Sequence, residues 1–328
     1  MQYRALGNTG WNISELSLGT WQVGGKWGAP FDAAAADRIL HTAMDAGINF
    51  IDTADVYSDG LSEKAVGKAV RARSEWIYVA TKCGRRLDPH TADAYTPGAL
   101  RTFVEGSLQR LGIEVIDLIQ LHCPPTAVYY RPEIFEAFDR MREAGLIRHL
   151  GVSVEKVEEG LKALDYPNVK SVQIIFNAFR QRPTELFFEQ AKRKQVGVIA
   201  RVPLASGLLT GKFDRQTTFG KDDHRHFNRD GAGFDKGETF SGIDYEQGLR
   251  AVAALREIFP GEQNLAPRAL QWILQHEAVS TVIPGASKAE QVTSNLSVYD
   301  TPGLTYAQVQ RINQVYDAYV KPGVHHLW

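Results

Sequence analysis

The sequence predicts an α/β fold, a (β/α)8 or TIM barrel, from two patterns. Short apolar runs alternate with stretches whose apolar residues recur at helical spacing, and eight such strand–helix units occur in 328 residues. The runs are continuously apolar, which is typical of parallel strands buried on both faces. The alternative is a doubly wound open sheet, but the early Gly-x-Gly-x-x-Gly that usually marks that fold is missing. We therefore expect one barrel domain over residues 1–328.

The eight expected strands are short and rich in β-branched and aliphatic residues. They lie at residues 16–18, 50–52, 77–81, 115–119, 149–153, 172–175, 196–200 and 281–283. The expected helices show apolar residues three and four positions apart, as amphipathic helices do. They lie at residues 36–43, 62–70, 100–111, 132–144, 155–164, 184–194, 244–258 and 267–276.

Three segments lie outside this alternation. Residues 3–13 contain a turn cluster at 7–10 and predict a β-hairpin that closes the bottom of the barrel. Residues 214–242 have no apolar period and follow the seventh strand, so we expect a long loop at the catalytic end. The tail 324–328 is apolar and aromatic, and we expect it to dock on its own barrel or on a neighbouring subunit.

Composition limits the possible partners. The 37 basic residues balance the 38 acidic residues, whereas a nucleic-acid footprint needs a basic excess. No apolar run reaches the ~18 residues of a membrane span, and the N-terminus lacks the apolar region of a signal peptide. The two cysteines, Cys83 and Cys123, are interpreted as buried thiols rather than a redox pair. We expect a cytoplasmic protein without nucleic-acid or membrane partners, and a homo-oligomer stays open.

Polar residues follow three consecutive expected strands, where the active sites of such barrels lie. Asp52 ends the second strand and Tyr57 follows it; Lys82 follows the third strand and His122 the fourth. Each has a plain structural explanation when taken alone, since an aspartate after a strand commonly caps a helix and a lysine is commonly solvated. Their occurrence together on one rim favours a catalytic site.

These four side chains suit the reduction of a carbonyl group. A tyrosine has a pKa of about 10, and a nearby ammonium lowers that pKa because it favours the phenolate. Lys82 supplies the ammonium, Asp52 keeps Lys82 charged and oriented, and His122 donates a hydrogen bond to the carbonyl oxygen. Because no side chain supplies hydride, a nicotinamide cofactor is implied.

These residues stand within motifs of a known family. Residues 47–57, Gly-Ile-Asn-Phe-Ile-Asp-Thr-Ala-Asp-Val-Tyr, resemble the first signature of the aldo-keto reductase superfamily, and Ser62, Glu63 and Gly67 follow in place. Thr81-Lys82 and residues 118–122, Leu-Ile-Gln-Leu-His, match the family's lysine and histidine positions. The resemblance covers essentially the whole chain. It implies NADP(H)-dependent reduction of carbonyls, with Tyr57 as proton donor in a tetrad completed by Asp52, Lys82 and His122.

The resemblance also implies cofactor-binding positions. The strand ends contribute Gly19, Thr20, Trp21, Asp52, Ser153, Gln173 and Arg201. The expected pyrophosphate loop contains Pro203, Leu204, Ser206, Gly207, Leu209 and Lys212, where small residues let backbone N–H groups approach phosphates. The expected adenosine end contains Gly285, Ser287, Lys288, Gln291 and Asn295. Lys288 beside a ribose 2′-phosphate favours NADP(H), and NAD(H) stays open.

Two positions depart from the family pattern. Val154 stands where an asparagine would follow Ser153, and Arg201 stands where an aromatic residue often stacks on the nicotinamide. A guanidinium can also lie flat on a ring. The expected substrate pocket contains Trp21, Trp27, Tyr57 and His122, and Phe31 adds to its aromatic wall. The substrate is expected to be a small carbonyl compound or alcohol. Residues 206–212, Ser-Gly-Leu-Leu-Thr-Gly-Lys, and the long segment after them resemble the bacterial general type of aldo-keto reductase, whose members are sugar- or polyol-related.

Two other classes of protein remain as alternatives. The first is a nucleotide-binding sensor or regulatory subunit that keeps this fold but turns over slowly. The second is a metal-dependent hydrolase, which needs several ligands on different strand ends, and only Asp52 and His122 stand there. We therefore expect no metal. Asp223, His224 and His226 are interpreted as residues of a solvated loop rather than as metal ligands.

Overall fold

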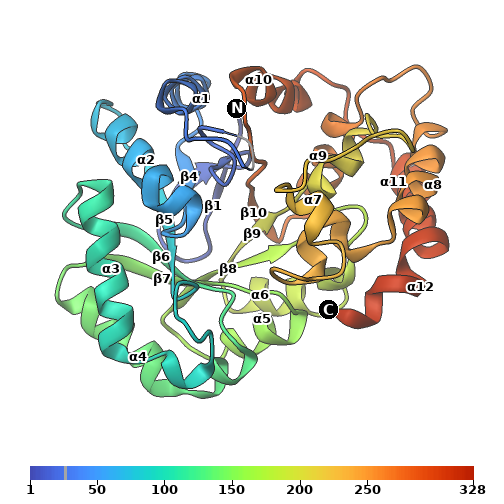
Figure 1. Cartoon of the computed structure of the whole chain (residues 1–328). Coiled ribbons are helices and arrows are strands. Elements are labelled where there is room, and N and C mark those ends of the chain that lie inside the picture. Colours follow the sequence, from blue (N-terminus) through green and yellow to red (C-terminus); the bar gives the residue numbers. More distant parts are fainter. Residues whose placement is uncertain (26–27) are drawn as a thin grey trace.

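The computed structural model of the chain describes residues 1–25 and 28–328. Eight parallel strands stand at its centre (Figure 1), and each pairs with its neighbours in chain order. They are β3 (Leu18–Gly19), β4 (Phe50–Asp52), β5 (Tyr78–Cys83), β6 (Ile116–His122), β7 (Ile147–Ser153), β8 (Val169–Ile175), β9 (Gly197–Arg201) and β10 (Val279–Val282). Bridges from Leu16 to Val282 and from Gly19 to Gly285 join the first strand to the last. The barrel prediction is confirmed, and the open-sheet alternative is wrong because such a sheet keeps two separate edges.

Helices pack around the outside of the strands (Figure 1). Those between consecutive strands are α1 (Ala33–Asp45), α2 (Leu61–Arg71), α3 (Pro97–Leu111), α4 (Pro132–Glu143), α5 (Val157–Ala163) and α6 (Phe187–Arg193), and the pair α8 (Tyr245–Arg256) and α9 (Ala266–Leu274) precedes β10. The sequence pattern explains each of them. In α1, for example, Asp32 caps the first turn by accepting from the N–H of Ala35 at 2.9 Å, and the apolar stripe faces the core.

The predicted N-terminal hairpin is present and covers one end of the barrel. Strands β1 (Tyr3–Ala5) and β2 (Asn12–Ser14) pair antiparallel, and Leu6 and Ile13 are fully buried against side chains of β4, β5, β6 and β9. The Arg4 guanidinium fixes the hairpin, because it donates to the carbonyl oxygen of Val279 at 2.9 Å and pairs with Glu15 at 2.7 Å. The C-terminal ends of the strands are therefore the end at which a site can open.

The longest connection follows β9, as expected, and lies at the C-terminal end of the strands. It contains the 3-10 turn η5 (Ala205–Thr210), helix α7 (His224–Phe227) and the 3-10 turns η6 (Lys236–Glu238) and η7 (Phe240–Gly242). Contacts between aromatic rings hold this connection together, although its sequence has no apolar period. Phe219 lies 5.3 Å from Phe213 and 5.9 Å from Phe240, measured between ring centroids. Such short turns leave no helical pattern in the sequence.

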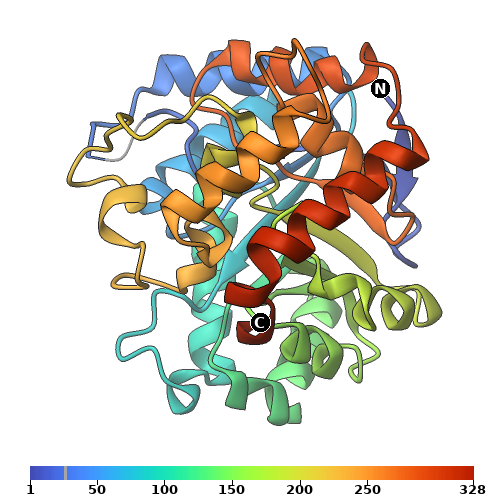
Figure 2. The same cartoon turned by 90° about the vertical axis from the view of Figure 1, so that its right-hand side faces the viewer.

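The helices beyond β10 lie outside the predicted pattern. These are α10 (Ala289–Leu296), α11 (Tyr306–Val315), the π turn η9 (Tyr316–Val320) and α12 (Lys321–Val324). Helix α11 and the segment after it run beside α8 on the outside of the barrel (Figure 2). No helix in the described ranges is long and apolar enough to cross a membrane.

The C-terminal tail docks on the chain's own barrel, which confirms one of its two predicted positions. Trp328 is 4% exposed, and its indole N–H donates to Asp235 at 3.0 Å. The Arg180 guanidinium lies 3.9 Å from the centroid of the indole ring. The last residue of the chain thus holds the long connection after β9.

Candidate active site

A buried ion pair lies at the C-terminal ends of β4 and β5. Lys82 is 1% exposed, and its ammonium donates to the Asp52 carboxylate and to the Tyr57 hydroxyl, the latter at 3.2 Å. Burial alone acts to lower the pKa of Lys82, but Asp52 and Tyr57 raise that pKa above its usual value. The amides of Gln120 and Gln173 donate to the other Asp52 oxygen at 3.0 Å and 2.7 Å. Both carboxylate oxygens therefore have partners, as a stable buried pair requires.

The turn that carries Tyr57 is held by residues of the recognised motif. The 3-10 turn η1 (Tyr57–Gly60) has positive φ at its last three residues, which makes a tight bend. Behind this turn, the Ser62 hydroxyl donates to the Thr20 hydroxyl at 2.8 Å. The fully buried Glu63 accepts from the Thr81 hydroxyl at 2.5 Å. The first bond ties α2 to the end of β3 and the second ties α2 to β5, so together they hold the turn that carries Tyr57.

The protonation of Tyr57 differs from the sequence-based expectation. Burial raises the pKa of Tyr57 above 10, the Lys82 charge acts to lower it, and Asp52 acts to raise it. The prediction that the pKa of Tyr57 is lowered is therefore wrong for the chain without ligands. Burial raises this pKa by more than the Lys82 charge lowers it. The hydroxyl is protonated at neutral pH and is ready to donate.

His122 faces the same space as Tyr57. The two ring centroids lie 5.9 Å apart in an edge-on arrangement. Burial lowers the pKa of His122 well below 6.5, and the positive charges of Lys82, Arg85 and Arg201 lower it further. The ring is therefore neutral at pH 7, and within the described chain its buried Nδ1 has no hydrogen-bond partner. A neutral imidazole can donate one hydrogen bond to a ligand.

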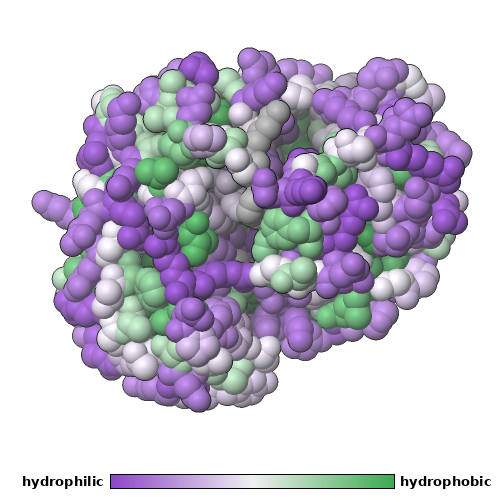
Figure 3. All heavy atoms as spheres, viewed as in Figure 1, coloured by the Kyte–Doolittle hydropathy of each residue, from purple (hydrophilic) through white to green (hydrophobic). Residues whose placement is uncertain are grey.

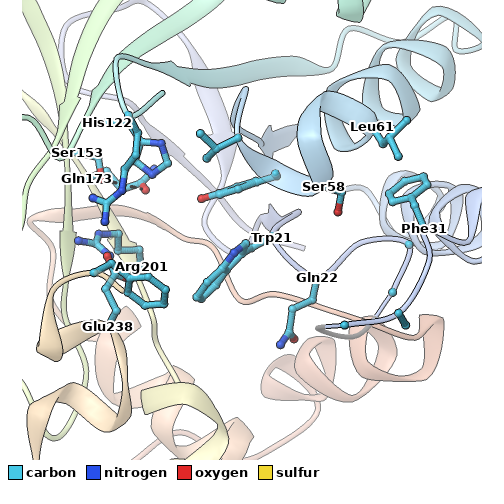
Figure 4. Close-up of a pocket in the computed structure, with 18 residues that line it drawn as sticks. Trp21, Gln22, Phe31, Ser58, Leu61, His122, Ser153, Gln173, Arg201 and Glu238 are labelled. Carbon is cyan, nitrogen blue, oxygen red and sulfur yellow. Dashed lines mark hydrogen bonds and ion pairs between the residues drawn. The ribbon is translucent and has the colours of Figure 1, made fainter. Parts of the chain in front are cut away.

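Tyr57 and His122 open onto a cavity of about 550 Å³, a size typical of small-molecule sites. Figure 3, which has the same view as Figure 1, shows a hollow in the molecular surface near the centre. In Figure 4, Trp21 stands opposite a polar group of side chains that comes from β6, β7, β8, β9 and η6. Besides Tyr57 and His122, the lining includes the aromatic residues Trp21, Phe31 and Phe234 and the polar residues Gln22, Ser58, Arg85, Ser153, Gln173, Arg201 and Glu238.

Three of the residues expected at the nicotinamide lie together on this wall. The Ser153 hydroxyl donates to the Gln173 amide oxygen at 3.4 Å. Arg201 pairs with Glu238 through Nη1, and its Nη2 donates to the carbonyl oxygen of Val154 at 2.9 Å. The Nε of Arg201 is buried without a partner in the described chain. A fixed, flat guanidinium on the cavity wall fits the face of a planar ring.

The expected pyrophosphate positions lie in the strained loop after β9. Ser206 and Gly207 have φ values of 56° and 94°, and Val202 and Ala205 are also positive. Such backbone strain is concentrated at ligand-binding sites. Pro203 and Leu209 are buried, so they could contact a ligand only through the backbone, whereas Lys212 is exposed and Leu204 is half-buried.

The expected adenosine positions lie directly before α10 and within it, after the neighbouring strand β10. Lys288 is exposed directly before the helix, and the Gln291 amide oxygen accepts from the N–H of Ser287 at 2.7 Å. Gly285 is exposed, whereas Asn295 is buried. A helix N-terminus with an adjacent lysine fits an anionic phosphate.

The remaining expected positions differ in accessibility. Gly19 and Thr20 are buried, and the Thr20 hydroxyl donates to the carbonyl oxygen of Asp52 at 3.0 Å. Both therefore shape the floor of the site from within. Trp21 and Phe31 line the cavity as expected. Trp27 lies outside the described residues.

Several residues of the site were not predicted from the sequence. Gln120 lies two residues before His122 on the same strand, so alternation along that strand could have indicated it. Phe234 and Glu238 come from the loop without a period, and no sequence signal pointed to them. The interpretation of His224 as solvated is wrong, because it is 2% exposed and its ring lies 4.9 Å from that of Trp21. Burial lowers the pKa of His224 to about 4.

A second cluster lies beside Arg201. Cys123, Glu155 and Glu238 place potential ligand atoms within 4.8 Å of one another. Cations of the chain already occupy this cluster, since Arg201 pairs with Glu238 and contacts Cys123, while Arg85 pairs with Glu155 at 3.3 Å. Both cysteines are free and buried, as expected, and burial raises the pKa of the Cys123 thiol to about 11.

Comparisons with known proteins agree with this architecture. The sequence profile of the Aldo/keto reductase family matches residues 15–317, and the chain belongs to this family of oxidoreductases. The oxidoreductase YqkF of Bacillus subtilis is 31% identical over 315 residues, which cover 95% of each protein. The glycerol dehydrogenase of Gluconobacter oxydans matches at a TM-score of 0.78 and 30% identity, over 97% of this chain and 96% of that one. The holo form of an aldo-keto reductase from Bacillus halodurans matches at 0.77 and 29% identity, over 99% of both chains.

Proposed function

We propose that this protein reduces small aldehydes and ketones to alcohols with a nicotinamide cofactor, and that it catalyses the reverse oxidation. The observation that carries this proposal is the contact of the Tyr57 hydroxyl with the buried Lys82 ammonium, at 3.2 Å, on a cavity that His122 also lines. A proton donor, a charge that stabilises its conjugate base and a neutral hydrogen-bond donor are the groups that carbonyl reduction requires.

Each residue has a defined task in the proposed reaction. A reduced nicotinamide, when bound, would supply the hydride that the carbonyl carbon needs. His122 donates a hydrogen bond to the carbonyl oxygen and orients it, and Tyr57 transfers its proton to that oxygen as negative charge develops. Lys82, held by Asp52, stabilises the phenolate until solvent restores the proton. In the oxidation of an alcohol, the Tyr57 phenolate takes up the hydroxyl proton.

The proposed cofactor position uses the fitting residues described above. Ser153 and Gln173 would hold the carboxamide, and Arg201 would hold the ring. The loop around Ser206 and the N-terminus of α10 would hold the phosphates. The exposed ammonium of Lys288 beside that helix end supports a preference for NADP(H) over NAD(H).

The proposed substrate is a small carbonyl compound or alcohol, of the sugar- or polyol-related kind. The mixed aromatic and polar lining of the cavity supports a short polar substrate. The resemblance to a glycerol dehydrogenase points in the same direction. The alternative of a slow nucleotide sensor has less support, because a sensor does not need the contact between Tyr57 and Lys82.

A titration with NADPH and with NADH tests the proposed function, read from the fluorescence of the six tryptophans. The protein should bind NADPH, and Lys288→Ala should weaken that binding by about tenfold or more while leaving NADH binding unchanged, because one charged hydrogen bond is lost. Lys170→Ala is the matched control, since it removes a lysine near the N-terminal end of β8, whereas the proposed cofactor site lies at the C-terminal ends of the strands. Failure of both nucleotides to bind would refute the proposal.

A further inference from the structure

Arg85 is a guanidinium on the cavity wall whose hydrogen-bonding capacity is largely unused. It follows Lys82 by three residues, where β5 ends, and its side chain is 23% exposed. A guanidinium carries five N–H donors. One of them meets a protein acceptor, Glu155 Oε1 at 3.3 Å, and the others have none among residues 1–25 and 28–328.

The contact with Glu155 leaves Arg85 available to a ligand. It is a single long contact, whereas strong arginine–carboxylate pairs are shorter and use two parallel hydrogen bonds. Burial, together with the charges of Asp235 and Glu238, raises the pKa of Glu155 to about 6, so this carboxylate holds its negative charge less firmly than an exposed one.

The other guanidinium on the wall is already committed. Arg201 pairs with Glu238, donates to the carbonyl oxygen of Val154 and contacts the Cys123 sulfur at 3.6 Å. It also lies where the proposed nicotinamide would be. Among the cations that line the cavity in the described chain, Arg85 therefore has the most donors left for a substrate, since Arg201 keeps only its Nε without a partner.

The size of the cavity that Arg85 shares with the proton donor favours a short substrate. Arg85, Tyr57 and His122 line one cavity of about 550 Å³, which the proposed nicotinamide must share. A short ligand whose carbonyl oxygen meets Tyr57 and His122 therefore occupies the same cavity that Arg85 lines. The aromatic walls lower the local dielectric, which strengthens an ion pair formed inside.

We propose that Arg85 binds the carboxylate or phosphate of a short carbonyl substrate, so that the natural substrate carries an anionic group a few carbons from its carbonyl. This inference rests on the proposed reductase function. It narrows the sugar- or polyol-related class to acids or phosphate esters, and it makes Arg85 the residue that selects them. An anion that accepts from two N–H groups of Arg85 would replace Glu155 as the partner of Arg85, and Arg201 would keep its own partners.

Paired substrates test the selection. Succinic semialdehyde and butanal have the same chain length with and without a carboxylate, and glyceraldehyde 3-phosphate and glyceraldehyde form the phosphate pair. We expect kcat/KM to favour the anionic member of at least one pair, and the favoured pair identifies the anion. In Arg85→Gln that preference should fall by about 10- to 100-fold, the value of one or two charged hydrogen bonds. Arg85→Lys should keep part of it.

A matched control removes the same charge elsewhere. Arg101→Gln takes a guanidinium from the exposed face of α3, where it pairs with Glu105, and should leave the preference unchanged. Glu155→Gln should act in the opposite direction and raise the preference, because it frees Arg85. An unchanged preference in Arg85→Gln, or the absence of any preference in the unsubstituted protein, would overturn the inference.

A binding measurement separates this inference from the proposed function. Titration calorimetry compares 4-hydroxybutyrate with 1,4-butanediol, and glycerol 3-phosphate with glycerol, on the NADP⁺-treated protein. If an anion binds and Arg85→Gln abolishes its binding while no carbonyl is turned over, the anion site stands and the reductase function fails. If neutral carbonyls are reduced and Arg85→Gln changes neither anion binding nor preference, the function stands and this inference fails.

Discussion

Replacing Lys82 by methionine should destabilise the protein through the charge that it leaves behind. Methionine has a similar length and volume, so the packing change is small. Asp52, 2% exposed, would lose its counter-charge. Breaking a buried pair in this way costs about 3–5 kcal/mol. Because Gln120 and Gln173 still donate to one Asp52 oxygen, we expect the lower end of this range, about 3 kcal/mol.

Urea unfolding followed by tryptophan fluorescence measures this loss. The matched variant is the double substitution Lys82→Met with Asp52→Asn, which removes both charges. If an uncompensated carboxylate causes the instability, the double variant should recover at least about 1 kcal/mol relative to Lys82→Met, as coupled neighbours do. A loss below about 1 kcal/mol in Lys82→Met, or a double-variant loss equal to the sum of the two single losses, would refute this explanation.

Three further predictions concern Trp328 in the tail, the buried carboxyl of Asp55 and the ring of His122. Trp328→Ala should lower the melting temperature and raise KM. Trp328 binds Asp235, which lies in the chain between the pocket residues Phe234 and Glu238. Equal KM values for Trp328→Ala and wild type would contradict this prediction. Burial, then Glu63, raises the pKa of Asp55 to about 7, so the folded state binds its proton more tightly than the unfolded state does. Stability should therefore fall as pH rises from about 4 to about 7, and Asp55→Asn should flatten that slope in urea midpoints measured across the range. Because the pKa of His122 lies well below 6.5, kcat/KM for reduction should show no histidine titration between about pH 6 and pH 8; a step near 6.5 that His122→Asn abolishes would count against this.

Local patterns made the barrel and the centre of its site predictable. The apolar runs fix where strands begin and end, and parallel strands bring their C-terminal ends to one rim. Asp52 and His122 end their strands, and Lys82 lies one residue before the end of β5, so their convergence follows from topology alone. The hairpin was predictable from its turn cluster at residues 7–10, and the cavity positions of Trp21 and Phe31 from their place after the first strand.

Long-range contacts account for what the sequence did not indicate. Glu238 reaches Arg201 from a loop without periodicity, and Trp328 meets Asp235 across 93 positions of the chain. The direction of the Tyr57 pKa shift depends on the balance between burial and the Lys82 charge, and only the packed structure gives the extent of burial. The role of Arg85 likewise depends on which of its donors find partners.

We propose that Tyr57 donates the proton in carbonyl reduction, and the activity of Tyr57→Phe decides whether it does. The substitution removes one hydroxyl and keeps the ring. We predict that kcat for reduction falls by about 10²–10⁴-fold, the usual contribution of general acid catalysis, while NADPH binding is retained. Tyr130→Phe, which removes a hydroxyl from a ring that is 66% exposed, should leave kcat unchanged. A Tyr57→Phe protein that reduces carbonyls at the rate of the unsubstituted enzyme would mean that another group donates the proton.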